Sequence, residues 1–223
     1  MKKHFSLSLI LIVLFLFTKA QKNAIEYGFQ SGVNINSAYG SGISKLSRGS
    51  TAGLHAGGHF KIQMAKHFGL KAILAYDQYG WAYHDLAFEN GNGTRLETGD
   101  LVNKLNYLNL PLLAEYSFGD KTKFYLDGGV FVGYLLSSKM IKKINQPSSY
   151  TQNIGSGQRR SGNFGVSAGA GIQIPIAHKI KLDFGVRDNL GLANIYKPQS
   201  SSDNATMKTN AFSIVTGLTF QMR

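Results

Sequence analysis

The stretch AIEYGFQSGVNIN, residues 24–36, alternates apolar and polar side chains along almost its whole length. Tyr27 and Phe29 fall on odd positions, whereas Glu26 and Gln30 fall on even positions. Because successive side chains of a strand point to opposite faces, this pattern predicts one long strand with an apolar and a polar face. Globular strands usually have about 5–6 residues, whereas a tilted transmembrane strand needs about 9–11. The stretch therefore predicts a strand that crosses a membrane.

The start of the chain has the organisation of a secretory signal peptide. Two lysines precede a short apolar run, residues 7–17, and the small residue Ala20 follows. The run is shorter than the ~20 residues of a membrane helix, and an uncleaved anchor is the alternative. We expect residues 1–20 to be removed, which leaves residues 21–223 as one domain.

The composition narrows the class of protein and of partner. The chain has no cysteine, which excludes a disulfide framework and lipid attachment at a mature N-terminal cysteine. Its formal net charge of +12 favours anionic partners. An exported chain without a concentrated basic element is not expected to bind nucleic acid. The expected partners are outer-membrane lipid and lipopolysaccharide, with other envelope or secretion proteins as a further class, and no cofactor is expected.

Seven more segments repeat the alternation, which makes eight expected strands. They are residues 51–63, 68–77, 107–116, 123–136, 163–174, 179–190 and 210–223. Pro111 is a local defect in one of them, because proline donates no backbone hydrogen bond.

The links between these segments alternate between short and long. The short links are residues 64–67, 117–121 and 175–178, and the long, polar ones are residues 37–50, 82–103, 137–160 and 193–209. This asymmetry is typical of an outer-membrane barrel of a Gram-negative bacterium with both termini in the periplasm, and an even number of strands closes the sheet. The expected fold is all-β: an eight-stranded antiparallel up-and-down transmembrane β-barrel.

Strand glycines indicate which face points inward. Gly28, Gly53, Gly129 and Gly169 all fall on the polar face. A glycine packs nothing on a surface that faces water, but in a narrow lumen it leaves room for a neighbouring long side chain. The polar face is therefore expected inside. The alternative is a soluble lipocalin-like barrel with an apolar cavity.

The inward positions include both acids and bases, which can pair across the interior, where an unpaired charge is costly. The predicted polar lumen comprises Glu26, His55, His59, Lys61, Lys71, Asp77, Glu115, Asp127, Asp183 and Arg187. A filled lumen is expected, and a narrow porin-like channel is the alternative. His55 and His59 would lie about 13 Å apart along a strand, too far to share a metal ion. No metal site is predicted.

The sequence carries no sign of catalysis. It has no GxSxG motif and no spacing that assembles a Ser, His and carboxylate triad. We expect no enzyme activity, with a lipid-modifying outer-membrane enzyme as the weaker alternative.

The third long link contains basic residues and no acid. These are Lys139, Lys142, Lys143, Arg159 and Arg160. Such a basic loop beside the outer leaflet would suit lipopolysaccharide phosphates or an acidic partner. The alternative is a solvated loop without a ligand.

Four segments carry a family resemblance: YLNLPLLAEY (107–116), FYLDGGVFVGYLL (124–136), FGVSAGAGIQI (164–174) and the terminal GLTFQMR (217–223). Together with the signal and the eight strands, they resemble the PorT-type family of outer-membrane β-barrel proteins. The resemblance implies a small barrel of a Gram-negative envelope, and for one branch a link to type IX protein secretion. The expected function is a structural, binding or assembly role in the cell envelope.

Overall fold

The computed structural model describes residues 24–43, 48–89, 96–144, 150–152, 159–197 and 204–222. The predicted signal peptide, residues 1–20, lies outside the described residues and stays a prediction. Among the described residues, no helix is long and apolar enough to cross a membrane.

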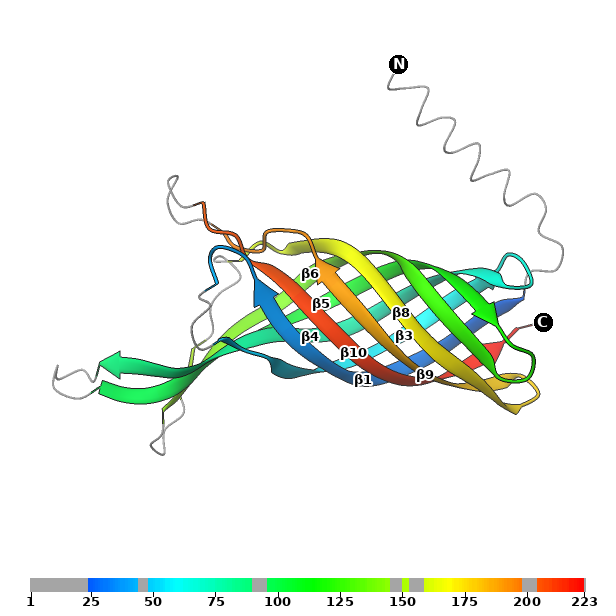
Figure 1. Ribbon diagram of the computed structural model, residues 1–223, viewed down its shortest axis with the longest axis horizontal. Coiled ribbons are helices and arrows are strands. Elements are labelled where there is room, and N and C mark those ends of the chain that lie inside the picture. The colour runs from blue at the N-terminus through cyan, green and yellow to red at the C-terminus, as the bar shows by residue number, and fades with distance from the viewer. Residues whose placement is uncertain are drawn as a thin grey trace, which may run out of the picture.

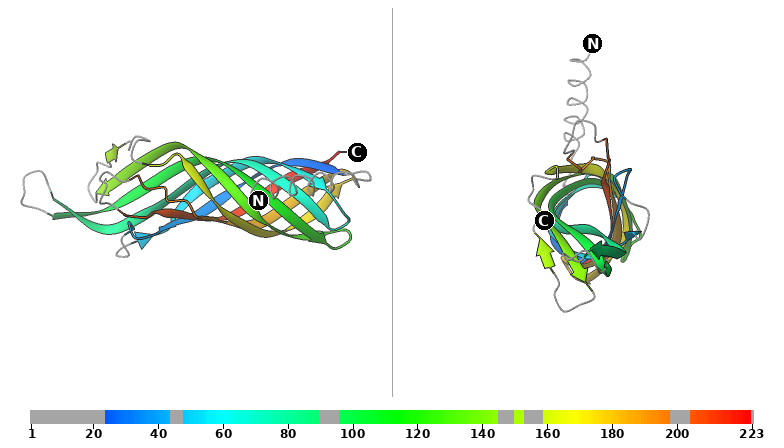
Figure 2. Two further views of the ribbon diagram at one scale, coloured as in Figure 1. Left: turned by 90° about the horizontal axis from the view of Figure 1, so that it is seen from above. Right: turned by 90° about the vertical axis from the view of Figure 1, so that its left-hand side faces the viewer.

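Eight long strands form one antiparallel ring (Figure 1; Figure 2, right). They are β1 (Ile25–Tyr39), β3 (Thr51–Gln63), β4 (Phe68–Glu89), β5 (Leu96–Phe118), β6 (Lys123–Ile144), β8 (Gly162–Ala177), β9 (Ile180–Gly191) and β10 (Lys208–Gln221). Two short strands, β2 (Arg48–Gly49) and β7 (Tyr150–Gln152), add to β4 and β6. Each long strand pairs with its neighbours in sequence, and β1 pairs with β10 to close the ring. The predicted eight-stranded up-and-down barrel is confirmed.

Two predicted link boundaries are wrong. The link expected at 82–103 is mostly strand, because β4 continues to Glu89 and β5 begins at Leu96. The link expected at 137–160 is also shortened, because β6 continues to Ile144. Past the end of the β5–β6 pairing at Gly99, the described parts of β4 and β5 pair only with each other and project as a ribbon (Figure 1). A ribbon outside the bilayer needs no apolar face, so the strict alternation that predicted the other strands does not continue through it.

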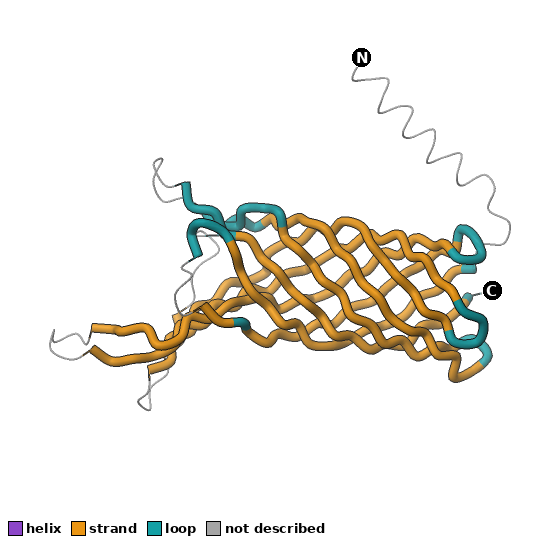
Figure 3. The backbone as a smooth tube through the Cα atoms, in the orientation of Figure 1, coloured by secondary structure: helices purple, strands orange, loops and turns teal. Residues whose placement is uncertain are grey.

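The two ends of the barrel differ, as Figure 3 shows. At the short-turn end, brief links join the strands, and both described chain ends meet there: the amide of Met222 donates to the carbonyl oxygen of Ile25 at 2.7 Å. At the opposite end, here called the long-strand end, the ribbon and the longer links gather. A bulge between Tyr83 and Leu86, with Asp85 at a φ of 54°, lies in β4 near the base of the ribbon.

The two faces of the wall have opposite chemistry. Large apolar side chains point outward and are exposed, with Phe29 at 67%, Leu54 at 62% and Tyr134 at 61%. An exposed apolar belt of this extent is the surface that a barrel presents to lipid. The inward positions are mostly polar and buried. This arrangement has the polar face inside, and it excludes the inverted, lipocalin-like arrangement.

Glycines make room inside the lumen, as predicted, and the clearest case involves Tyr125. The phenol of Tyr125, on β6, reaches across β8 and donates a hydrogen bond to Asp183 on β9. It lies so close to Gly171 and Gly185 that a Cβ atom at either position would overlap the hydroxyl group. A larger residue at either glycine would therefore displace this side chain.

Candidate functional site

A chain of alternating charges lines the lumen in the half nearer the short-turn end. In order of contact it comprises Lys181, Glu26, Lys61, Glu115, Lys71, Asp127 and Arg187, here called the charge ring. Lys61 Nζ lies 2.9 Å from Glu26 Oε2 and 2.7 Å from Glu115 Oε1. At the far end, Arg187 Nη2 lies 3.0 Å from Asp127 Oδ2.

The charge ring links six strands and begins and ends on β9. Its members come from β9, β1, β3, β5 and β4, then from β6, and finally from β9 again. A further carboxylate, Asp183, accepts hydrogen bonds from Tyr125 at 2.8 Å and Gln173 at 2.9 Å. With Asp183, four cations face four carboxylates. Buried charges are tolerated when they are paired and hydrogen-bonded in this way.

A second network occupies the middle of the lumen around Asp77, which is fully buried. Its carboxylate accepts hydrogen bonds from His55 Nδ1 at 2.7 Å, Asn34 at 3.0 Å and Asn109 at 2.7 Å. Asn109 also donates to the hydroxyl of Tyr79. The lumen is therefore crossed by hydrogen-bonded side chains here as well.

An apolar plug fills the lumen toward the long-strand end. It comprises Trp81, Leu105, Tyr107, Leu135, Ile195 and Met207, all buried. Ile195 and Met207 belong to the link between β9 and β10 and are joined by a backbone hydrogen bond of 2.8 Å. That link therefore folds back over the mouth of the barrel.

Arg159, which lies shortly before β8, packs against the plug. Its guanidinium lies 5.2 Å from the centre of the Trp81 ring, and Nη1 donates to Met207 Sδ at 2.7 Å. Burial lowers the pKa of the Arg159 guanidinium from its ordinary value, although arginine stays charged in proteins. A cation over a tryptophan face is a favourable contact, stronger where water is excluded.

The structure places all ten predicted lumen residues inside the barrel, each of them buried. Six of them are members of the charge ring, Asp183 accepts hydrogen bonds beside it, and His55 contacts Asp77. His59 stands apart and contacts Thr219 at 3.0 Å. The two histidines thus have different partners, and among the described residues no group of three or more His, Cys, Asp or Glu side chains is arranged to hold a metal ion.

Sequence reasoning missed several members of these networks. Lys181 lies two residues before Asp183, on the same face of β9, and this spacing is a signal that could have found it. Asn34 and Asn109 also fall on the inward face of their strands. Trp81 and Ile195 gave no such signal, because the alternation of β4 was not followed that far and Ile195 lies in a link.

The predicted basic loop is not one loop, which corrects that prediction. Lys139, Lys142 and Lys143 belong to β6. They are held in register opposite Lys104, Leu101 and Asp100 of β5. Arg159 is packed on the plug, and only Arg160 is an exposed link residue of the set. Continued backbone pairing of β6 with β5 separates the lysines from the arginines.

We expect Glu115→Gln to destabilise the barrel by about 3–5 kcal/mol, because Lys61 and Lys71 then share too few buried carboxylates. Adding Lys71→Met restores the balance of charge and should recover most of this loss. Urea unfolding of the refolded chain in lipid vesicles measures both variants. A loss below about 1 kcal/mol for the single variant, the value of an exposed pair, would contradict the role of the charge ring.

Comparison with known proteins gives the family. The family model described as outer membrane protein beta-barrel domain matches residues 19–197. A search of curated protein sequences gave no match.

Two outer-membrane proteins are among the solved structures to which the chain is similar. Outer membrane protein W of E. coli is 13% identical, with 91% of this chain and 100% of that chain covered and a TM-score of 0.47. OprG of Pseudomonas aeruginosa is also 13% identical, with 90% and 95% covered and a TM-score of 0.45. Since the family model spans most of the sequence, the chain belongs to the family of outer-membrane β-barrel domain proteins.

Proposed function

We propose that the chain is a filled, non-conducting barrel with a structural, binding or assembly role in the Gram-negative cell envelope. The observation that carries this proposal is the occupied lumen. The charge ring, the network around Asp77 and the apolar plug follow one another along the barrel. Such a lumen leaves the lipid-facing wall and the two ends as the surfaces on which the protein can act.

We further propose that the short-turn end faces the periplasm and the long-strand end faces the outside. Bacterial outer-membrane barrels have short periplasmic turns and longer extracellular loops. In this orientation both termini are periplasmic, and the ribbon of β4 and β5 projects away from the cell.

The partners in this proposal are outer-membrane lipid, lipopolysaccharide, and other envelope or secretion proteins. Support of type IX protein secretion is its sharpest form, and it rests on the resemblance to the PorT-type family. The projecting ribbon favours a protein partner, because a two-stranded ribbon offers backbone edges that another strand can pair with.

The proposed role is non-enzymatic. His55 and Asp77 resemble part of a catalytic triad, but the other ring nitrogen of His55 lies 2.6 Å from Gln30 Nε2, not from a serine. Both side chains are also buried in the lumen. This pair is therefore a structural contact, and lipid could not reach it.

We expect no stepwise conductance from the purified chain in a planar lipid bilayer, because the lumen is occupied along its length. A porin of known conductance inserted into the same bilayer provides the positive control. Reproducible unitary steps that scale with the amount of barrel inserted would support the narrow-channel alternative instead.

The orientation can be tested with single cysteines, because the native chain has none. Thr98 lies in the ribbon and Lys121 in a short turn, and both are exposed. A membrane-impermeant maleimide added to intact cells should label Thr98→Cys but not Lys121→Cys, whereas both should react after the outer membrane is permeabilised. The opposite pattern would invert the proposed orientation.

The assembly role predicts a change in secretion. A deletion strain should lose proteins from its secreted fraction, and the wild-type gene should restore them. Complementation with Lys121→Cys is a matched control and should also restore the secreted proteins, because that substitution lies away from the charge ring and the ribbon. An unchanged secreted fraction would argue against support of type IX secretion and favour a role in envelope structure.

A further inference from the structure

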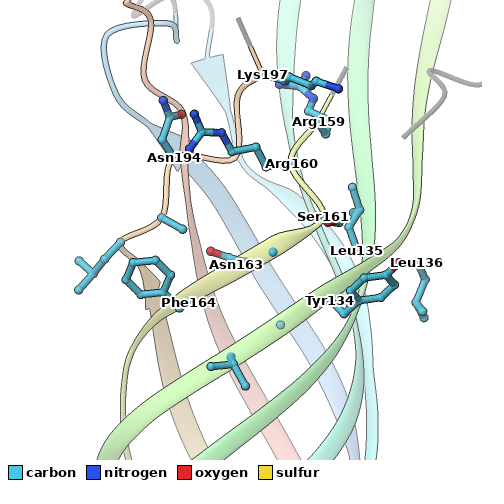
Figure 4. Close-up of a pocket in the computed structure, with 15 residues that line it drawn as sticks. Tyr134, Leu135, Leu136, Arg159, Arg160, Ser161, Asn163, Phe164, Asn194 and Lys197 are labelled. Atoms are coloured by element: carbon cyan, nitrogen blue, oxygen red, sulfur yellow. The ribbon is translucent and has the colours of Figure 1, made fainter. Parts of the chain in front are cut away.

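The barrel wall has a notch between β6 and β8 at the long-strand end. Pairing of these strands stops at Tyr134 and Gly162, although β6 continues beyond this point. The residues before Gly162 turn toward the link after β9 instead: Arg159 bridges to Tyr196, and the amide of Arg160 donates to the carbonyl oxygen of Ile195 at 3.0 Å. The notch opens a cavity of about 1310 Å³, here called the outer groove (Figure 4).

The outer groove has an apolar wall and a cationic rim. Its wall consists of outward-facing side chains of the lipid belt, namely Val132, Tyr134, Leu136, Phe164 and Leu192. At the rim, Arg159, Arg160 and Lys197 lie together above this wall (Figure 4). None of the described lining residues is acidic. The apolar wall and the cationic rim thus meet along one line at the long-strand end of the barrel.

The rim is built for an anion. Arg159 is held by Trp81 and Met207, so its guanidinium needs little ordering when a ligand binds. Arginine presents several donors in a planar fork that fits phosphate well.

The apolar wall argues against a purely polar anion as the ligand. A free phosphate would use the rim alone and leave the apolar wall unused. A phosphorylated lipid would place its phosphate on the rim and its acyl chains along the wall, continuous with the surrounding bilayer. We propose that the outer groove binds a phosphorylated lipid of the outer leaflet, with Arg159, Arg160 and Lys197 as phosphate ligands. This inference rests on the proposed orientation, which exposes the groove to that leaflet.

The test uses the full chain in nanodiscs that contain bisphosphorylated lipid A as the probe. The groove variant is Arg160→Gln with Lys197→Gln, since both side chains are exposed and neither belongs to the plug. The matched control is Lys139→Gln with Lys143→Gln, which removes the same charge from exposed β6 positions outside the groove lining. Native mass spectrometry after extraction counts the lipid A that each barrel retains.

We expect the groove variant to retain about tenfold less lipid A than the wild type, the loss expected for two weakened charge-assisted hydrogen bonds. The control variant should match the wild type. Trp81 is the only tryptophan of the chain and lies beside Arg159, so lipid A should also shift its fluorescence in the wild type and the control. Equal retention by both variants would overturn the proposal, because general electrostatic attraction would then explain binding.

Two further probes identify the ligand. The wild type should retain dephosphorylated lipid A as poorly as the groove variant retains lipid A. Equal retention of both lipids by the wild type would overturn the role of the phosphate. Inorganic phosphate should not displace lipid A at millimolar concentration, and full displacement would indicate a site for a free anion. An inverted cysteine-labelling pattern would overturn the orientation without changing retention in nanodiscs, so the two failures are distinguishable.

Discussion

The pairing of buried charges around the lumen is the constraint on which the rest of the structure depends. Each member of the charge ring occupies a fixed register position on its strand, and the seven members come from six of the eight long strands because β9 contributes two. A slip of one residue in any strand would turn its charge toward lipid and its apolar side chains inward. The ring therefore specifies the register of six strands, while the apolar belt specifies which face of each strand meets the bilayer.

A filled lumen also determines where function can reside. The interior side chains are already hydrogen-bonded to one another, and the plug separates them from the long-strand end. In the proposed function, ligands and partners are thereby limited to the outer wall, the ribbon and the links. Arg159 connects the two regions, because it packs on Trp81 of the plug and also lines the outer groove.

The sequence was most informative where the bilayer imposes a rule on it. Alternation between two faces predicted eight strands, the inward face and the buried charges, because lipid on one side and a narrow lumen on the other permit few exceptions. Outside the bilayer this rule lapses, and the ribbon of β4 and β5 looked like a loop. The plug was also missed, since Ile195 and Met207 reach the lumen through a turn of the link, which no period in the sequence records.

Unequal strand lengths explain why the outer groove lies where it does. β6 continues past the start of β8, so Tyr134 pairs with Gly162, which has no side chain, and Leu136 pairs with no residue of β8. The segment that precedes β8 turns toward the mouth, with Arg159 packed on the plug and Arg160 exposed, which brings both charges over this apolar notch. The same backbone path that closes the lumen therefore creates an amphipathic surface on the outside, and a lipid with a phosphate would match both of its halves.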